Sequence, residues 1–395
     1  MGSEPGVGWN IVKELAKHHD IWVLTRDDNR ATIEAELAER PIPGLSFVYF
    51  DLPGVRWWKR GLYAVHFHYY LWQIKAYFVA RQLHQKIHFD IAHHVTYVRY
   101  SSPSFLSLLP IPFIWGPVGG GESAPKAFWQ AFDQRGKVYE FLRDLSRHIG
   151  ERDPFTRMTA RRSMVSWATT DDTAKRLIHM GAHHVEVLSQ VGFFADEISA
   201  PDTVQQPDPT LIRFISVGRL LHWKGFHLGL EAFAQANLPP EAEYWLIGKG
   251  PEQERLRSLV GDLGLAHQVN FLDEMPREEL MQKLGTCSAL VHPSLHESGG
   301  FVCLEAMALG RPVICLELGG PAVQVTSETG FKVPAHTPKQ AIADMAEAMT
   351  RLAADPALRM QMGQSAQRHV HNVYRWEAKA LLLSQVYQKT VAMQQ

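Results

Sequence analysis

Short apolar runs with strand character alternate with longer segments of helical period along the whole chain. In the second half the runs are residues 211–217, EYWLIG, NFLD, SALVHP and PVICLE. Each is followed by roughly 10 to 15 residues of amphipathic helical pattern. The first half repeats this theme with DIWVLTR, LSFVYF, FDIAHHV, PFIWGP and MVSWATT. The alternation predicts an α/β protein in which helices cover parallel sheets.

A polar segment with three prolines, APDTVQQPDPT at 200–210, separates the two halves and is typical of an interdomain linker. We therefore expect two doubly wound, Rossmann-like domains. The predicted N-terminal, acceptor-side domain covers 1–205 and the C-terminal domain 206–374, with a final helix over 375–395 crossing back to the first domain. Open α/β sheets bind ligands at the carboxyl ends of their strands, so a cleft between the domains is expected.

The composition is that of an ordinary globular protein. A chain of 395 residues with 46% hydrophobic and 21% charged residues can bury two cores. The net charge of −1 provides no global field for nucleic acid, which is not an expected partner. Three cysteines, Cys287, Cys303 and Cys315, match no metal spacing and suit a reducing compartment. We expect a cytoplasmic protein with neither a secretory leader nor a membrane-spanning helix.

Two glutamates, Glu297 and Glu305, flank a pair of glycines in HESGGFVCLEAMALG. The pattern places Glu297 in the loop after the strand SALVHP and Glu305 in a helix over 301–309. Gly299 and Gly300 allow close approach of the backbone to a ligand. The free amides that begin the helix can bind phosphate or sugar hydroxyls.

Two further signals precede this one. In SVGRLLHWKG, Gly218 follows a strand, and Arg219 and Lys224 form a cationic pair suited to a diphosphate. In GKGPEQERL, Gly248 and Gly250 follow another strand and would let a flat base approach the backbone. Each signal alone is common, and an isolated glutamate pair is usually a solvated helix face. Their occurrence together and in this order is specific.

On these motifs, the chain resembles the retaining, nucleotide-sugar-dependent glycosyltransferases of family four, which have the two-domain GT-B fold. The resemblance covers nearly the whole sequence. The family's Glu-x7-Glu motif falls on Glu297 and Glu305, and its Gly-Arg-Leu and Lys-Gly motifs fall on Gly218 and Lys224 with their neighbours. SEPGVGW and WGPVGGGE resemble first-domain loops of the family. One departure is HESGG, where many members have Pro-Glu-Pro-Phe-Gly, which predicts a sugar pocket of different shape.

The resemblance implies a role for each matched residue. Glu305 would hold the ribose hydroxyls, Arg219 and Lys224 the diphosphate, and Glu297 with nearby backbone amides the donor sugar. The glycine loop 6–8 would approach the donor phosphates. The nucleotide-sugar site predicted in this way comprises Gly6, Gly8, Gly218, Arg219, Lys224, Gly248, Gly250, Glu297, Ser298, Gly299, Gly300, Phe301, Val302 and Glu305.

Cleavage of a glycosyl-phosphate bond builds positive charge on the anomeric carbon and negative charge on the departing diphosphate. Fixed cations and helix amides stabilise such a transition state. The resemblance implies retention of configuration by attack on the face that the nucleotide leaves, with a phosphate oxygen taking the acceptor proton. Glu297 is then a positioning residue rather than a nucleophile. The sequence has no Asp-x-Asp, and Arg219 and Lys224 can replace a divalent ion, so we expect no essential metal or cofactor.

Among the twenty histidines, His93 and His94 stand at the end of the strand FDIAHHV, where family members often present a histidine to the donor sugar. The usual family spacing is His-x-His. Because side chains alternate along a strand, only one of two adjacent histidines can face the cleft. His94 is the catalytic-site candidate, weighed against a structural role. His292 is expected to be structural, and no spacing in the sequence suggests a zinc site.

The stretch 52–89 contains six cations and ten aromatic residues but no Asp or Glu. One interpretation is a helix packed on the first sheet with a solvated basic edge. The other is an interfacial surface that meets anionic headgroups. The second interpretation favours a lipid-linked acceptor and peripheral contact with the inner face of a membrane, through Arg56, Trp57, Trp58, Lys59 and Arg60.

Three hypotheses for function follow. The leading one is a transferase that moves a sugar from a nucleotide-diphosphate sugar to a glycan or lipid-linked acceptor, in polysaccharide or cell-envelope glycan synthesis. The second is a non-catalytic nucleotide-sugar or glycan-binding subunit with the same fold. A dinucleotide-dependent oxidoreductase is disfavoured because Gly248-x-Gly250 lacks the third glycine of the fingerprint.

In the resembling family, the loop similar to GSEPGVGW follows a first strand that is central in the N-terminal sheet. In this sequence Met1 directly precedes Gly2. We therefore expect the N-terminal domain to lack this strand, with the glycine loop tethered on one side only.

Overall fold

A computed structural model describes residues 3–53, 62–97, 99–194 and 211–393. The chain divides into two compact units, described separately below. The first contains Met1–Gly121, Ser146–Gly192 and Trp376–Gln395, and the second contains Glu122–Leu145 and Phe193–Arg375. The segment 122–145 groups with the second unit, whereas the predicted N-terminal domain included it. The predicted linker at 200–210 and the basic residues 56–60 lie outside the described residues.

The second unit is built on a six-stranded parallel sheet with the order β12-β11-β10-β7-β8-β9. Five of these strands were predicted from the sequence, and all five are confirmed. The short β12 was missed because GFKV alternates poorly and contains a lysine. The bounds are β7 Arg213–Val217, β8 Glu243–Ile247, β9 Val269–Leu272, β10 Ala289–His292, β11 Val313–Leu316 and β12 Gly330–Val333. Strand order reverses between β7 and β10, so this is the topological switch point of a doubly wound sheet.

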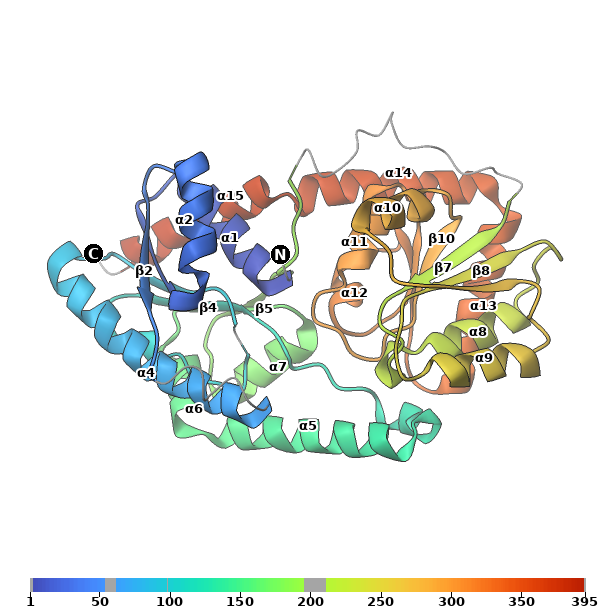
Figure 1. Cartoon of the computed structure of the whole chain (residues 1–395), viewed down its shortest axis with the longest axis horizontal. Coiled ribbons are helices and arrows are strands. Elements are labelled where there is room, and N and C mark those ends of the chain that lie inside the picture. Colours follow the sequence, from blue (N-terminus) through green and yellow to red (C-terminus); the bar gives the residue numbers. More distant parts are fainter. Residues whose placement is uncertain (1–2, 54–61, 98, 195–210, 394–395) are drawn as a thin grey trace. The chain divides into compact units, whose positions relative to one another are not determined.

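Helices cover both faces of this sheet (Figure 1). Helices α8, α9 and α13 share one apolar core with the strands, in which Phe214, Leu230, Tyr244 and Met345 are buried. Helix α11 packs against α10 and α14. The bounds are α8 Phe226–Gln235, α9 Gln253–Asp262, α10 Arg277–Gly285, α11 Phe301–Ala308, α12 Gly319–Gln324, α13 Pro338–Ala354 and α14 Pro356–Val373.

The described strands of the first unit form two separate parallel sheets. One pairs β1 with β2, and the other has the order β3-β4-β5-β6. The five strands predicted for this half are present, and the three-residue β6 is an addition. Their bounds are β1 Ile21–Arg26, β2 Leu45–Phe50, β3 Ala92–His94, β4 Phe113–Val118, β5 Val165–Ala168 and β6 Val185–Val187. The α/β fold class is therefore confirmed in both units.

The helices of the first unit include α15, which comes from the end of the chain (Figure 1). Helix α5 contributes its residues up to Leu145 to the second unit and those from Ser146 to the first. Over the described residues, no helix combines the length and apolar character that crossing a bilayer requires. The bounds are α1 Ser3–Leu15, α2 Arg30–Glu39, α4 Leu62–Ile87, α5 Gln134–Arg152, α6 Pro154–Arg162, α7 Asp171–Met180 and α15 Trp376–Ala392.

The prediction that residues 6–8 form a loop is wrong, because these residues lie within helix α1. Val7, Ile11 and Leu15 follow at the helical spacing of four and are all buried. Burial of this apolar stripe therefore outweighs the low helix propensity of two glycines. Contact of Gly6 and Gly8 with donor phosphates stays a prediction.

Candidate nucleotide-sugar site

Two loops meet at the switch point of the second unit, where β7 and β10 pair in parallel. The loop after β7 carries Gly218, Arg219 and Lys224, and the loop after β10 carries Glu297. The ammonium group of Lys224 donates a hydrogen bond to Oε2 of Glu297 at 2.6 Å. Two charged residues that are 73 positions apart in the sequence are thus brought together at the edge where open α/β sheets bind ligands.

Gly225 lets these two loops touch. It follows the short 3-10 turn His222–Lys224 and has a left-handed φ of 65°. A Cβ atom at Gly225 would lie 2.1 Å from the carbonyl oxygen of Pro293, which only glycine avoids. The turn brings Lys224 back toward the end of β7, where a Cβ at Gly218 would lie 4.0 Å from the Lys224 Nζ atom.

The Glu297 carboxylate is held by three donors. Besides Lys224, Nε2 of His292 donates to Oε2 at 2.8 Å, and the backbone N–H of Gly300 donates to Oε1 at 3.3 Å. Burial alone would raise the pKa of Glu297, but His292 and Lys224 outweigh it and lower the pKa well below its usual range. Glu297 is therefore an ionised, fixed acceptor. The buried His292 contacts this site residue directly, as part of its support.

Helix α11 begins directly after this loop and presents its first amides there. Gly300, in the left-handed region, caps it, and Phe301 and Val302 start its first turn. The loop is fixed from its other side by α12, because the N–H of Gly320 donates to the carbonyl of Glu297 at 2.7 Å. The Gln324 side-chain amide also donates to the carbonyl of Gly299. The sequence analysis missed this support, although Gly319-Gly320-Pro321 directly after a strand is a recognisable signal.

Glu305 lies one turn into α11 and is mostly buried. Its Oε1 atom accepts a hydrogen bond from Nε of Arg277, at the start of α10, at 3.0 Å. Arg277 was not among the predicted site residues. Arg219, by contrast, is exposed at the end of β7. The two glutamates of the motif thus differ in surroundings, because Glu297 is ringed by donors and Glu305 has an exposed arginine beside it.

Gly248 and Gly250 have a structural reason for being glycine. A Cβ atom at Gly248 would lie 2.1 Å from the carbonyl oxygen of Gly218, and one at Gly250 would lie 2.3 Å from that of Leu220. The loops after β7 and β8 therefore pack backbone against backbone. The space that these two glycines provide holds protein backbone, and approach of a base to them stays a prediction.

Two buried glutamates from the segment 122–145 also contact these loops, and the sequence analysis missed both. Oε1 of Glu140, on α5, accepts from Nε2 of His222 at 3.2 Å and from Nε2 of His296 at 3.0 Å. These histidines stand beside Lys224 and Glu297 in the sequence. Oε2 of Glu122 accepts from the Ser298 hydroxyl at 2.6 Å.

The Glu140 carboxylate is fully buried. Burial would raise its pKa, but hydrogen bonds from His222 and His296 together with nearby Arg143 lower it. Trp223 stacks on His296 with ring centres 5.3 Å apart and strengthens the same junction. An acid inside the apolar helical run VYEFL is the sequence signal that could have identified Glu140, since an acid is rarely buried without partners.

The remaining predicted residues, His94, Gly6 and Gly8, lie in the first unit. Burial lowers the pKa of His94 to about 4, with a backbone hydrogen bond at Thr96 opposing it, so the ring is neutral at pH 7. Its Nε2 atom lies 3.0 Å from the Tyr69 hydroxyl. His93 points to other partners, the Tyr387 hydroxyl at 2.5 Å and the carbonyl of Gly116 at 2.6 Å. The two adjacent histidines therefore face different partners, as strand alternation predicted.

Comparisons with known proteins identify the family of the second unit and the fold of the chain. Residues 202–369 match the family described as glycosyl transferases group 1. A D-inositol 3-phosphate glycosyltransferase from Corynebacterium diphtheriae is 36% identical over 179 residues. That match covers 43% of this chain and 41% of the relative, so less than half of each protein is aligned.

Two solved structures resemble the whole chain in fold. Sucrose-phosphate synthase from Thermosynechococcus elongatus has a TM-score of 0.64 at 20% identity, covering 100% of this chain and 94% of the other. Anabaena HepE, solved with UDP and glucose, has a TM-score of 0.60 at 16% identity, covering 98% and 96%. At these identities the likeness concerns the fold. The chain therefore has the GT-B fold, and its residues 202–369 form a domain of the glycosyl transferases group 1 family.

Proposed function

We propose that this protein transfers a sugar from a nucleotide-diphosphate sugar to a glycan or lipid-linked acceptor with retention of anomeric configuration. The observation that carries the proposal is the meeting of Lys224, Glu297 and the start of helix α11 at the switch point of the second sheet. A cation, a fixed carboxylate and free helix amides at one strand edge match the diphosphate and the hydroxyls of such a donor.

Arg219 and Lys224 bind the diphosphate in this proposal. Lys224 is paired with Glu297 at 2.6 Å, and both side chains are partly exposed. An arriving diphosphate offers Lys224 a stronger anionic partner, and Glu297 is then left to accept hydrogen bonds from the donor sugar. Glu305, one turn further along α11, accepts from the ribose hydroxyls in place of Arg277.

These groups act where charge develops. As the glycosyl-phosphate bond breaks, negative charge grows on the diphosphate and is stabilised by Arg219, Lys224 and the first amides of α11. A phosphate oxygen takes the acceptor proton and the acceptor attacks from the same face, which retains configuration. Glu297 positions the sugar and is not a nucleophile. The two cations carry the charge that a metal ion carries elsewhere, so we propose no essential metal.

We further propose that the acceptor is a precursor in polysaccharide or cell-envelope glycan synthesis. A lipid-linked acceptor agrees with the basic, aromatic stretch 52–89, of which residues 56–60 lie outside the described residues. The enzyme would then work in the cytoplasm at the inner face of the membrane. The relative from Corynebacterium diphtheriae is a D-inositol 3-phosphate glycosyltransferase. Since the match covers 41% of that relative, its substrate is not assigned to this chain.

A thermal-shift screen of nucleoside diphosphates and their sugars tests the donor assignment. A ligand at 100 times its dissociation constant stabilises the folded protein by roughly 2.7 kcal/mol. We expect one nucleoside diphosphate to raise the melting temperature, and Glu305→Ala to reduce that rise. Absence of any shift across the panel would contradict the proposed donor class.

Turnover is tested separately by donor hydrolysis without acceptor. Slow release of nucleoside diphosphate is expected from a transferase, and binding without release indicates the non-catalytic subunit. Activity should also survive a chelator. Complete loss with EDTA and recovery with magnesium or manganese would show that the metal-free mechanism is wrong.

A further inference from the structure

Helix α5 has an inverted distribution of side chains. Its acids Glu140 and Glu151 are buried, although acids normally face water. Its large apolar side chains lie on the exposed side instead: Val138, Tyr139, Phe141, Leu142, Leu145 and Ile149 are each 45% exposed or more. The helix is thus polar inside and apolar outside along most of its length.

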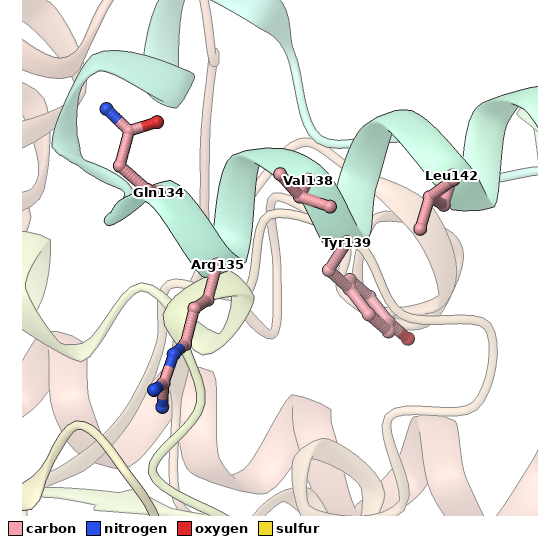
Figure 2. Close-up of a pocket in the computed structure, with 5 residues that line it drawn as sticks. All are labelled: Gln134, Arg135, Val138, Tyr139 and Leu142. Atoms are coloured by element: carbon pink, nitrogen blue, oxygen red, sulfur yellow. The ribbon is translucent and has the colours of Figure 1, made fainter.

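The exposed residues follow the helical period and form one stripe. Val138, Leu142, Leu145 and Ile149 are spaced by three or four positions, so they lie above one another on successive turns. Figure 2 shows the side chains of Arg135, Val138, Tyr139 and Leu142 along α5. Together with Gln134 they line an open pocket of about 430 Å³. A continuous apolar stripe of this kind on a described surface indicates a partner.

The exposed charges on this helix have one sign. Arg135 and Arg152 are exposed at opposite ends of α5, and Asp144 is half-buried and accepts from the Ser123 hydroxyl. The two arginines are about 25 Å apart along the helix axis. A second copy of the chain is a poor partner, because parallel pairing of two α5 helices puts Arg135 against Arg135. Antiparallel pairing puts Arg135 against Arg152, so a cation meets a cation in both arrangements.

We propose that this stripe and its two arginines form a lipid-binding face that lies flat in the headgroup region of an anionic bilayer. The α5 face comprises Arg135, Val138, Phe141, Leu142, Leu145, Ile149 and Arg152. The apolar side chains enter the boundary between headgroups and acyl chains, and the arginines meet anionic headgroups. This face rests on the membrane contact of the proposed function, and it places that contact on α5 instead of on residues 56–60.

The three cysteines are all buried, which permits a selective probe. An environment-sensitive fluorophore on Phe141→Cys of the full chain should brighten and shift to the blue with vesicles of phosphatidylcholine and phosphatidylglycerol. Phosphatidylcholine alone should give a much smaller change. The matched control is Met360→Cys on α14, because Met360 and Phe141 are exposed to 58% and 60%. An equal response at both positions, or none at Phe141→Cys, overturns the proposal.

A second measurement tests membrane contact independently of donor binding. Phe141→Ser combined with Leu145→Ser should weaken sedimentation with anionic vesicles by at least about tenfold, and Arg135→Glu by roughly fivefold. Nucleoside diphosphate affinity should stay at the unmodified value, because none of these residues belongs to the donor site. If vesicle binding survives all of these substitutions, α5 is not the lipid-binding face, and this conclusion does not depend on the measured nucleoside diphosphate affinity. A fluorophore response that grows with protein concentration without lipid overturns it in favour of a second copy.

Discussion

The described strands of the two units are arranged differently, in one sheet in the second unit and in two sheets in the first. In the second unit, β10 and β11 are buried at every position within one continuous six-stranded sheet. In the first unit, β1 and β2 have no fully buried residue, and among the described strands they pair only with each other. The donor loops therefore follow strands of one continuous sheet, whereas the described strands of the first unit are divided between two sheets.

The largest expected effect is at Gly225, which tests how tightly the donor loops are joined. Gly225→Ala should destabilise the second unit by about 2 to 4 kcal/mol, because its Cβ atom would lie 2.1 Å from the Pro293 carbonyl oxygen. Hydrogen exchange of the β7 and β10 amides measures this unit alone. Gly261→Ala on α9 is the control, since nothing lies within 4 Å of its Cβ position. Unchanged exchange in Gly225→Ala would mean that the two loops are not in fixed contact.

The next effect concerns nucleotide binding to the second unit. Glu305→Ala should weaken the affinity for nucleoside diphosphate by about 1.5 to 3 kcal/mol, the scale of a charge-assisted hydrogen bond. Isothermal titration measures the change. Arg277→Ala is the matched variant, because it removes the present partner of Glu305 at 3.0 Å and keeps the carboxylate. If both variants bind as the unmodified protein does, Glu305 does not hold the ribose.

A smaller effect is expected for the junction at Glu140, and it depends on pH. The folded-state pKa of Glu140 is lowered below the ordinary 4.5. Its stabilisation is therefore fully present above that value and is lost as pH falls toward the folded-state pKa. Glu140→Gln should destabilise the second unit by about 1 to 2 kcal/mol at pH 7, because an amide gives His222 and His296 a weaker acceptor.

The measurement is urea unfolding at several pH values. The difference between Glu140→Gln and the unmodified protein should shrink as pH falls below the ordinary carboxyl pKa. Glu328→Gln, at an exposed position, should behave like the unmodified protein throughout. A constant difference across the whole range would mean that the charge of Glu140 is not what joins the two loops.

The sequence predicted the second unit more fully than the first. In the second unit, apolar runs bounded by glycine and proline identified five of six strands, and the order of motifs placed Lys224 and Glu297 in one site. Local patterns could mark Glu140 as an unusual acid but could not reveal its partners, which are 82 and 156 residues away. In the first unit, SEPGVGW was interpreted as a loop because it resembles a first-domain loop of the family. The spacing of Val7, Ile11 and Leu15 was the stronger signal, since burial of a helical stripe outweighs propensity.

The smallest expected effect concerns the glycines of helix α1 in the first unit. Nothing lies within 4 Å of a Cβ atom at Gly6, whereas one at Gly8 would lie 2.7 Å from Cγ2 of Thr96. Gly6→Ala should therefore stabilise the first unit by about 0.5 to 1 kcal/mol, because alanine lowers the backbone entropy of the unfolded chain. Gly8→Ala should cost stability, since Thr96 has to move. Hydrogen exchange in α1 and in α15, which packs against it, reports both changes. If 6–8 instead forms a phosphate-binding loop, Gly6→Ala would weaken donor binding and leave exchange in α1 unchanged, and the helical assignment of these glycines would fail.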